Sequence, residues 1–328
     1  MTDIPAKPTN LYLTSNFVET TDNNGVYSRI ACEGTWKDLF ETTVAEKKKA
    51  DRKKSSDFTI EWNGSRYRCN LADSYHGYGL TMRILPAGAP SFREDLKLDA
   101  NIVLSLLKGT GLTLFAGQMG SGKSTTMFAA LERMDKKERG PIGTVEDPIE
   151  GLLTGPGVIQ REVGTHVDSF AQAIKDFVRQ NRHTIAVSEI RDPETANAAL
   201  MAASTGHSVV ATIHADSALD VFPRMLALVD DKLAKILPRT MRGIWWQHVV
   251  RFGDSDRKPL PVYESLEVTN AVRQILEAGV DKLPQLGNEM QRQSRKSMAE
   301  TAMQLVAQRL ATRDEVAEFI NRRGRINE

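Results

Sequence analysis

A nine-residue segment of this 328-residue chain has the residue types of a phosphate-binding loop. It fits the pattern G-x-x-x-x-G-K-[ST] and consists of Gly117, Gln118, Met119, Gly120, Ser121, Gly122, Lys123, Ser124 and Thr125. The apolar run 112–116 before it predicts a strand, and the apolar-periodic stretch after it predicts a helix. Such a loop binds phosphate through backbone N–H groups at the helix N-terminus. Lys123 would then bridge the β- and γ-phosphates of a nucleotide, and the Ser124 hydroxyl would bind Mg²⁺.

Two acidic clusters follow predicted strands downstream of this loop. Glu146 and Glu150 come after the apolar run 141–145, and Glu189 comes after the run 184–187. Open α/β sheets hold their ligands at the carboxyl ends of the strands, which favours a role at the nucleotide over ordinary surface charge. We expect Glu189 to hold Mg²⁺, in part through water. Either Glu146 or Glu150 would orient or deprotonate the attacking water, and the sequence leaves this choice open.

Two histidines flank a further predicted strand, residues 208–213. His207 precedes this strand and His214 follows it. A histidine at a strand end beside a γ-phosphate could report the nucleotide state through its hydrogen bonds. A histidine beside an apolar run is also commonly a structural residue, and the chemistry alone leaves both interpretations open.

The elements before residue 90 predict a small α+β domain. Residues 9–34 read as strand, loop and strand, and residues 35–54 as a helix that ends in a basic run. Strands at 58–62 and 66–70 flank the turn Asn63-Gly64, a strong hairpin signal, and a last strand is expected at 79–85. The basic run is more simply a solvated helix end than a phosphate site. The Pro- and Gly-containing stretch 86–91 is the predicted linker.

Residues 91–328 predict a second domain of α/β type. Strands are expected at 112–116, 141–145, 184–187 and 208–213, with helices between them. After about residue 265 the chain is predicted to be mostly helical, for example at 298–310. The nucleotide site would therefore be held by the carboxyl ends of several strands in this second domain.

The composition excludes some classes of protein. The 43 basic and 42 acidic residues give a net charge of +1, and only 6% of residues are aromatic. Tight, general binding to nucleic acid is therefore not expected. Two cysteines are too few for a disulfide framework or a four-cysteine zinc site. The N-terminus lacks the pattern of a signal peptide and no run of about 18 apolar residues occurs, so we expect a cytoplasmic protein.

In their order and spacing, these motifs resemble those of the PilT/GspE secretion ATPase superfamily. Its members are hexameric motors of type IV pili, type II secretion and type IV secretion. The matching segments are the phosphate loop, or Walker A motif, 117–125, an aspartate box at 144–150, the run 160–163, a Walker B region at 184–192 and a histidine box at 205–214. The resemblance implies a RecA-like P-loop NTPase core preceded by a PAS-like N-terminal domain.

The resemblance also implies roles that spacing alone does not give. It implies a homohexamer that hydrolyses ATP with Mg²⁺ and works on an inner-membrane platform protein, at the cytoplasmic face of that membrane. Arg68 and Arg83 match arginines of the N-terminal domain that approach nucleotide in such motors, and Arg179 is a weaker candidate. His207 and His214 would report or support the nucleotide state.

The sequence departs from the family at several places. Ser188 stands where members usually carry glycine, and Asn181-Arg182-His183 replaces an Asp-Pro-Asp run. The cysteine count disfavours the zinc-bearing branches. Residues 270–276 resemble a motif of pilus retraction ATPases, but pilus retraction, secretion and conjugation all stay open. Two alternatives are a DNA-translocating P-loop motor and a nucleotide-binding assembly module without hydrolysis.

Overall fold

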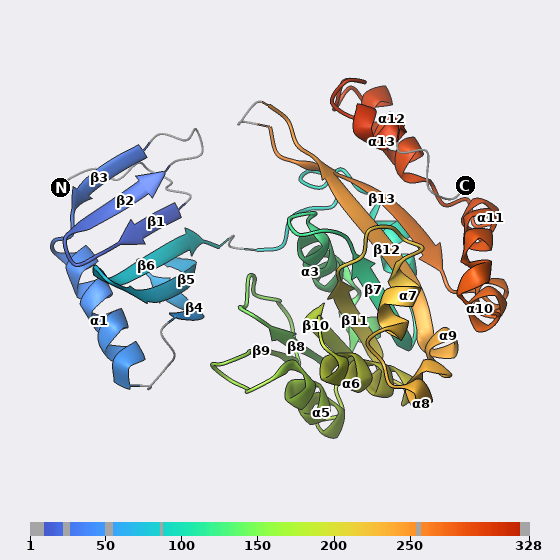
Figure 1. The fold of residues 1–328 in the computed structure, drawn as a ribbon, viewed down its shortest axis with the longest axis horizontal. Coiled ribbons are helices and arrows are strands. Elements are labelled where there is room, and N and C mark those ends of the chain that lie inside the picture. The colour runs from blue at the N-terminus through green and yellow to red at the C-terminus, as the bar shows by residue number, and fades with distance from the viewer. Residues whose placement is uncertain (1–9, 22–26, 50–54, 86–87, 254–256, 322–328) are drawn as a thin grey trace.

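The computed structural model describes residues 10–21, 27–49, 55–85, 88–253 and 257–321, which form two separate β-sheets (Figure 1). The six strands of the first sheet lie between residues 10 and 84, and the seven strands of the second between residues 111 and 267. An α+β unit therefore precedes an α/β unit, as the sequence predicts.

The N-terminal sheet is antiparallel, with the strand order β3-β2-β1-β6-β5-β4. Its elements are β1 (Asn10–Leu13), β2 (Phe17–Thr21), β3 (Tyr27–Ala31), α1 (Thr35–Lys49), β4 (Ser55–Trp62), β5 (Ser65–Ser74) and β6 (Gly77–Ile84). Asn63 and Gly64 both have positive φ, 49° and 73°, as a tight hairpin turn requires. The sequence prediction missed β2, and residues 50–54 of the predicted helix lie outside the described residues.

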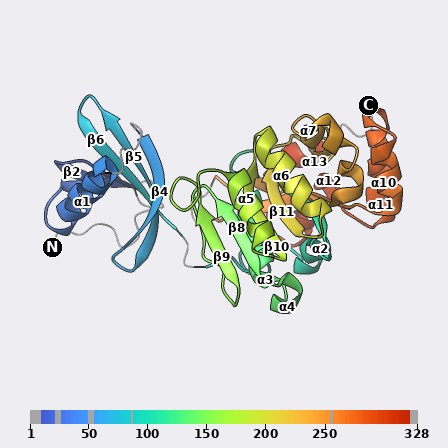
Figure 2. The same ribbon diagram turned by 90° about the horizontal axis from the view of Figure 1, so that it is seen from below.

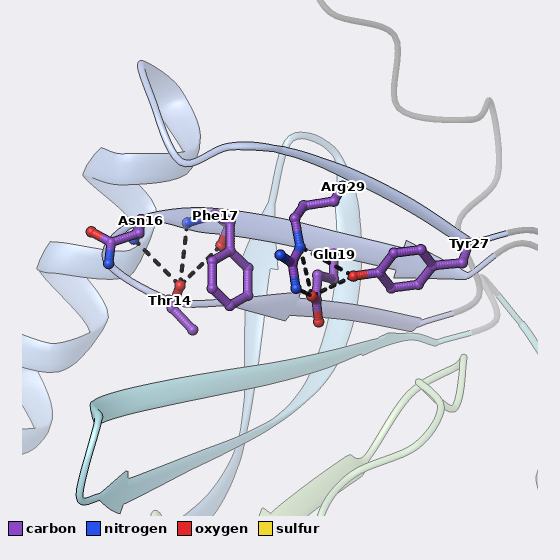
Figure 3. A network of polar contacts seen from close by, with 6 residues as sticks. All are labelled: Thr14, Asn16, Phe17, Glu19, Tyr27 and Arg29. Carbon is purple, nitrogen blue, oxygen red and sulfur yellow. Dashed lines mark hydrogen bonds and ion pairs between the residues drawn. The ribbon is translucent and has the colours of Figure 1, made fainter.

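The buried face of this sheet packs against α1 around Leu13, Phe40 and Leu80. The other side of β2 and β3 carries a network of exposed polar side chains (Figure 3). Arg29 donates from Nε to Glu19 Oε1 at 2.8 Å, and its guanidinium lies 4.5 Å from the centre of the Phe17 ring. Tyr27 also donates to Glu19. These contacts link the edge strand β3 to its neighbour β2.

The second sheet has the strand order β13-β12-β7-β11-β10-β8-β9, and only β13 runs antiparallel to its neighbour. Its strands are β7 (Gly111–Ala116), β8 (Ile142–Glu146), β9 (Val158–Glu162), β10 (Thr184–Ile190), β11 (Ser208–Ile213), β12 (Met241–Val250) and β13 (Leu260–Glu267). Every residue of β7 and β11 is buried, which is typical of central parallel strands covered on both faces. The prediction found β7, β8, β10 and β11 but missed β9, β12 and β13.

Helices cover both faces of this sheet (Figure 2). Phe115 and Trp245 pack with α2 and α3 on one face, whereas Leu112 and Leu114 pack with α5 and α6 on the other. The helices are α2 (Ala100–Ser105), α3 (Lys123–Arg133), α4 (Lys136–Arg139), α5 (Phe170–Arg179), α6 (Pro193–Ser204), α7 (Val221–Leu226), α8 (Asp231–Ala234), α9 (Leu237–Thr240), α10 (Asn270–Glu277), the 3-10 helix η1 (Val280–Gln285), α11 (Leu286–Arg292), α12 (Met298–Ala307) and α13 (Ala317–Asn321).

The helical C-terminal region predicted from about residue 265 begins with α10, directly after β13. Its helices lie along the outer side of β12 and β13 (Figure 1). Within the described part of the chain, no helix has both the length and the apolar character needed to cross a bilayer.

Candidate functional site

The predicted phosphate loop connects β7 to α3, so Gly122 is the N-cap residue of α3. Two of its glycines leave no room for a side chain. A Cβ atom at Gly117 would lie 2.3 Å from the backbone oxygen of Gln247, and one at Gly122 would lie 2.9 Å from Gln247 Nε2. Gly122 also has a backbone φ of +78°, a value that residues other than glycine rarely adopt. The loop conformation therefore depends on these glycines.

Two polar groups of the loop are buried without strong partners. Lys123 is 7% exposed and donates from Nζ to the Gln118 carbonyl at 3.3 Å. Burial lowers the pKa of the Lys123 ammonium, and the nearby Glu189 carboxylate opposes that shift. Ser121 Oγ is buried and has no hydrogen-bond partner among the described residues. A phosphate bound in the cleft beside Lys123 would give this ammonium a strong partner, since buried polar groups are normally hydrogen-bonded.

A cleft of about 520 Å³ opens beside this loop and is lined by both sheets. Its walls include most, but not all, of the residues that the sequence analysis selected. These are Arg68, Arg83, Met119, Gly120, Lys123, Ser124, Thr125, Glu146, Glu150, Glu189 and His214. The strands β7, β8, β10 and β11 all run parallel, so the residues that follow them meet at one edge of the sheet.

The two candidate bases, Glu146 and Glu150, differ in their surroundings. Glu146 ends β8, and its Oε1 accepts hydrogen bonds from Thr144 Oγ1 at 2.6 Å and Gln160 Nε2 at 2.9 Å. Burial raises the pKa of the Glu146 carboxyl, and these two hydrogen bonds oppose the shift. Glu150 is exposed and pairs with Arg68 at 3.3 Å. Glu146 is therefore fixed and desolvated, whereas Glu150 is held by a surface ion pair.

Glu189 in β10 and His214 after β11 form a second pair in the cleft, with 3.2 Å between Glu189 Oε1 and His214 Nε2. Burial and the charge of Lys123 lower the pKa of His214, and Glu189 opposes them. This shift favours the neutral imidazole, whose Nε2–H can donate to the carboxylate. This donation would hold the Glu189 carboxylate in place.

The N-terminal sheet contributes two arginines to the cleft. Arg68 in β5 and Arg83 in β6 are direct cross-strand partners, and both line the cleft. Like charges at such positions destabilise a sheet unless something compensates for them. Arg68 has Glu150 as a partner. An anion between the two guanidinium groups would compensate both charges.

Of the other selected residues, Gly117, Gln118, Ser121 and Gly122 of the loop do not line this cleft, and neither do His207 and Arg179. His207 precedes β11, so it lies at the opposite end of that strand from His214, with Nδ1 2.7 Å from the Arg182 backbone oxygen. The structure does not bring His207 to the cleft of its own chain. Arg179 is exposed at the end of α5, and its Nη1 lies 4.0 Å from Asp176 Oδ1.

Sequence reasoning missed the strand beside the loop. Gln247 of β12 and Arg251, which directly follows it, contact the loop backbone: Gln247 donates to the Ser121 carbonyl at 2.7 Å, and Arg251 donates to the Gly120 carbonyl at 2.9 Å. The available signal was the polar pair Gln247 and His248 within the otherwise apolar run 244–250, which the strand prediction did not use.

Comparison with known proteins gives one family match. Residues 43–323 match the family described as type II/IV secretion system protein. The chain is 33% identical to the uncharacterized protein YggR of Escherichia coli K12, with 68% of this chain and 70% of that protein covered. It is 38% identical to type II secretion system protein E of Pectobacterium carotovorum, with 60% of this chain covered. It spans only about 40% of the length of that protein.

Solved structures show the same architecture. The crystal structure of the pilus retraction motor PilT with bound ADP is similar with a TM-score of 0.81 and 28% identity, and the match covers 95% of this chain and 93% of that one. The ATPase DotB of Legionella pneumophila is similar with a TM-score of 0.75 and 22% identity, covering 96% of this chain and 92% of that one. At that identity the likeness to DotB concerns the fold alone.

Proposed function

Because the chain belongs to the family of type II/IV secretion system proteins, we propose that it is a Mg²⁺-dependent ATP hydrolase that acts as a homohexameric motor. The family match supports the resemblance to the PilT/GspE secretion ATPase superfamily, and the likeness to PilT supports a RecA-like core behind a smaller N-terminal domain. One observation carries the proposal: the cleft joins the phosphate loop, four carboxylates and two arginines.

In this proposal, backbone N–H groups of residues 117–125 bind the phosphates, and the buried Lys123 bridges the β- and γ-phosphates. Ser124 and Glu189 would hold Mg²⁺, in part through water, and the neutral His214 would orient Glu189. Bound Mg²⁺ supplies charge neutralisation on the phosphate oxygens. The weakly partnered Lys123 ammonium and the tight glycine positions fit such a ligand.

We assign the general base to Glu146 in preference to Glu150. A base must be held within reach of the attacking water, and its pKa should lie closer to the working pH than that of a solvated carboxylate. Two hydrogen bonds fix Glu146, and burial raises its pKa. Glu150 instead pairs with Arg68, so its expected role is to hold that arginine until ATP is bound.

Arg68 and Arg83 would stabilise the charge that develops on the transferred phosphoryl group. Both come from the N-terminal sheet, so the site is complete only when the N-terminal unit and the core close on the nucleotide. We place the boundary between these two units near residue 90. His207 lies outside this cleft, so we assign it no role in the hydrolysis step.

The partner we propose is an inner-membrane platform protein of a pilus or secretion system, approached from the cytoplasmic side. Pilus retraction and type IV secretion or conjugation both fit the family and the site. Genes for pilins beside this one would favour retraction, whereas transfer genes would favour secretion or conjugation.

Substitution of Lys123 tests the assignment of the cleft. The Lys123→Ala variant should lose at least about 100-fold in the rate of phosphate release from ATP, because the charge that pairs with the phosphates is removed. The matched control is Lys232→Ala, which removes an exposed lysine of α8. Equal rates for wild type and Lys123→Ala would exclude the cleft as the site of hydrolysis.

A further inference from the structure

Gln247 lies in the middle of β12, is 2% exposed and uses both atoms of its side-chain amide. Its Oε1 accepts hydrogen bonds from Thr126 Oγ1 in α3 and from Trp245 Nε1, both at 2.8 Å. Its Nε2 donates to the carbonyl of Ser121 in the phosphate loop at 2.7 Å. This one side chain therefore joins the sheet, the loop and the helix that follows the loop.

These hydrogen bonds determine the orientation of the Gln247 amide, that is, which position its oxygen and its nitrogen occupy. Two donors face Oε1, so Nε2 must be the atom that faces the Ser121 carbonyl. In a trans peptide the C=O and the following N–H point in opposite directions. Holding the Ser121 carbonyl against β12 therefore directs the Gly122 N–H away from β12. The backbone oxygen of Gln247 also packs where a side chain at Gly117 would lie.

Trp245, which donates to the Gln247 amide, is itself held in place by packing and hydrogen bonds that extend to α12. The Trp245 ring stacks on Tyr263 of β13, with ring centres 4.1 Å apart and planes 16° apart. Tyr263 in turn exchanges two hydrogen bonds with Thr301 of α12: its N–H donates to the threonine hydroxyl, and that hydroxyl donates to its carbonyl. The amide is therefore anchored to the C-terminal helices and not to a mobile side chain.

We propose that Gln247 is the positioning residue of the phosphate loop: its Nε2–H bond to Ser121 sets the loop in the conformation that binds nucleotide phosphates. This inference rests on the proposed function. It predicts that losing the donated hydrogen bond weakens nucleotide binding by the folded protein. A residue that only fills the core would change stability and leave the affinity unchanged.

The test is the Kd of the full chain for ADP with Mg²⁺, measured beside the melting temperature. Gln247→Glu keeps the shape of the side chain and the hydrogen bonds accepted from Thr126 and Trp245. It replaces the donating Nε2 with an oxygen that faces the Ser121 carbonyl oxygen. The affinity should fall at least about tenfold at pH 8 through loss of one bond and the added repulsion. It should recover toward wild type as the pH falls to 6, because a protonated carboxyl group can donate.

Two further variants complete the test. Thr126→Val removes a different bond to the same amide and should lower the melting temperature with less than about a twofold change in Kd. Gln247→Met removes all three side-chain bonds and should weaken ADP binding without recovery at low pH, which keeps the test valid if Gln247→Glu does not fold. Wild-type affinity in Gln247→Met or Gln247→Glu would overturn the inference. Failure of the wild-type chain to bind ADP would overturn the proposed function instead.

Discussion

At the scale of single residues, the environment of each carboxylate separates two glutamates that the sequence treats alike. Glu146 is partly buried and bonded to Thr144 and Gln160, whereas Glu150 is exposed and paired with Arg68. A base acts in its deprotonated form, so its activity is present above its pKa and is lost as the pH falls through it. Because burial raises the pKa of Glu146, this loss should begin at a higher pH than for a solvated glutamate.

The hydrogen bond from Thr144 lowers the pKa of Glu146, so Thr144→Val should raise it further. The acid limb of the kcat/KM profile for ATP hydrolysis should then move to higher pH. The control is Thr113→Val, another buried threonine of the same sheet, whose hydroxyl donates to Leu106. A limb that stays in place, or moves to lower pH, would contradict the assignment of Glu146 as the base.

Most of the candidate residues in the core could be selected from sequence because they lie at or after the carboxyl ends of strands in a parallel sheet. His207 shows the limit of that reasoning. It precedes the six-residue strand β11, and His214 follows it, so the two lie about 23 Å apart along the strand at roughly 3.3 Å per residue. Only a residue at the carboxyl end shares an edge with the phosphate loop. Proximity to a motif in the sequence does not show at which end of a strand a residue lies.

At the scale of elements, the N-terminal sheet holds the loop after β8. Thr59 of β4 donates to Glu162 Oε2 at 2.9 Å, and the same oxygen accepts from the Ile149 N–H at 3.2 Å. Arg66 of β5 donates to the Ile149 carbonyl at 3.2 Å. These contacts lie beside the aspartate box, so the position of the N-terminal unit is coupled to the segment between Glu146 and Glu150.

Removal of the Thr59 hydroxyl tests this coupling. Thr59→Val should lower the free energy of unfolding by about 1.5–3 kcal/mol, because the buried Glu162 carboxylate loses one of its hydrogen bonds. Denaturation in urea measures the change. Thr81→Val, at an exposed position of β6, should change stability by less than about 0.5 kcal/mol. Equal losses in both variants would show that the Thr59 contact does not hold the two units together.

The elements that sequence reasoning found have local signals, such as the Asn63-Gly64 turn and the apolar runs of β7 and β11. The missed strands carry polar residues whose partners come from distant segments. Glu264 in β13 is buried because it accepts the N–H of Met298 in α12. Gln247 in β12 is buried because the phosphate loop and α3 satisfy its amide. Such pairings are not visible in a window of neighbouring residues.

At the scale of the whole molecule, the proposed site needs residues from both units. The core supplies the phosphate loop and the carboxylates, and the N-terminal sheet supplies two arginines at adjacent cross-strand positions. Such a division suits the proposed motor, because closing two units on ATP and opening them after hydrolysis would convert chemistry into movement. The proposed hexamer would repeat this arrangement in each of its chains.

The most direct measurement is the rate of Mg²⁺-dependent phosphate release from ATP by the wild-type chain and by Arg83→Ala. The wild type should release phosphate only with Mg²⁺, and Arg83→Ala should lose at least about tenfold in kcat with little change in ADP affinity. The control is Arg29→Ala, which removes an arginine of the same sheet that lies in the network of Figure 3, and should hydrolyse ATP at the wild-type rate. Absence of Mg²⁺-dependent release, or equal rates in Arg83→Ala and Arg29→Ala, would contradict the account.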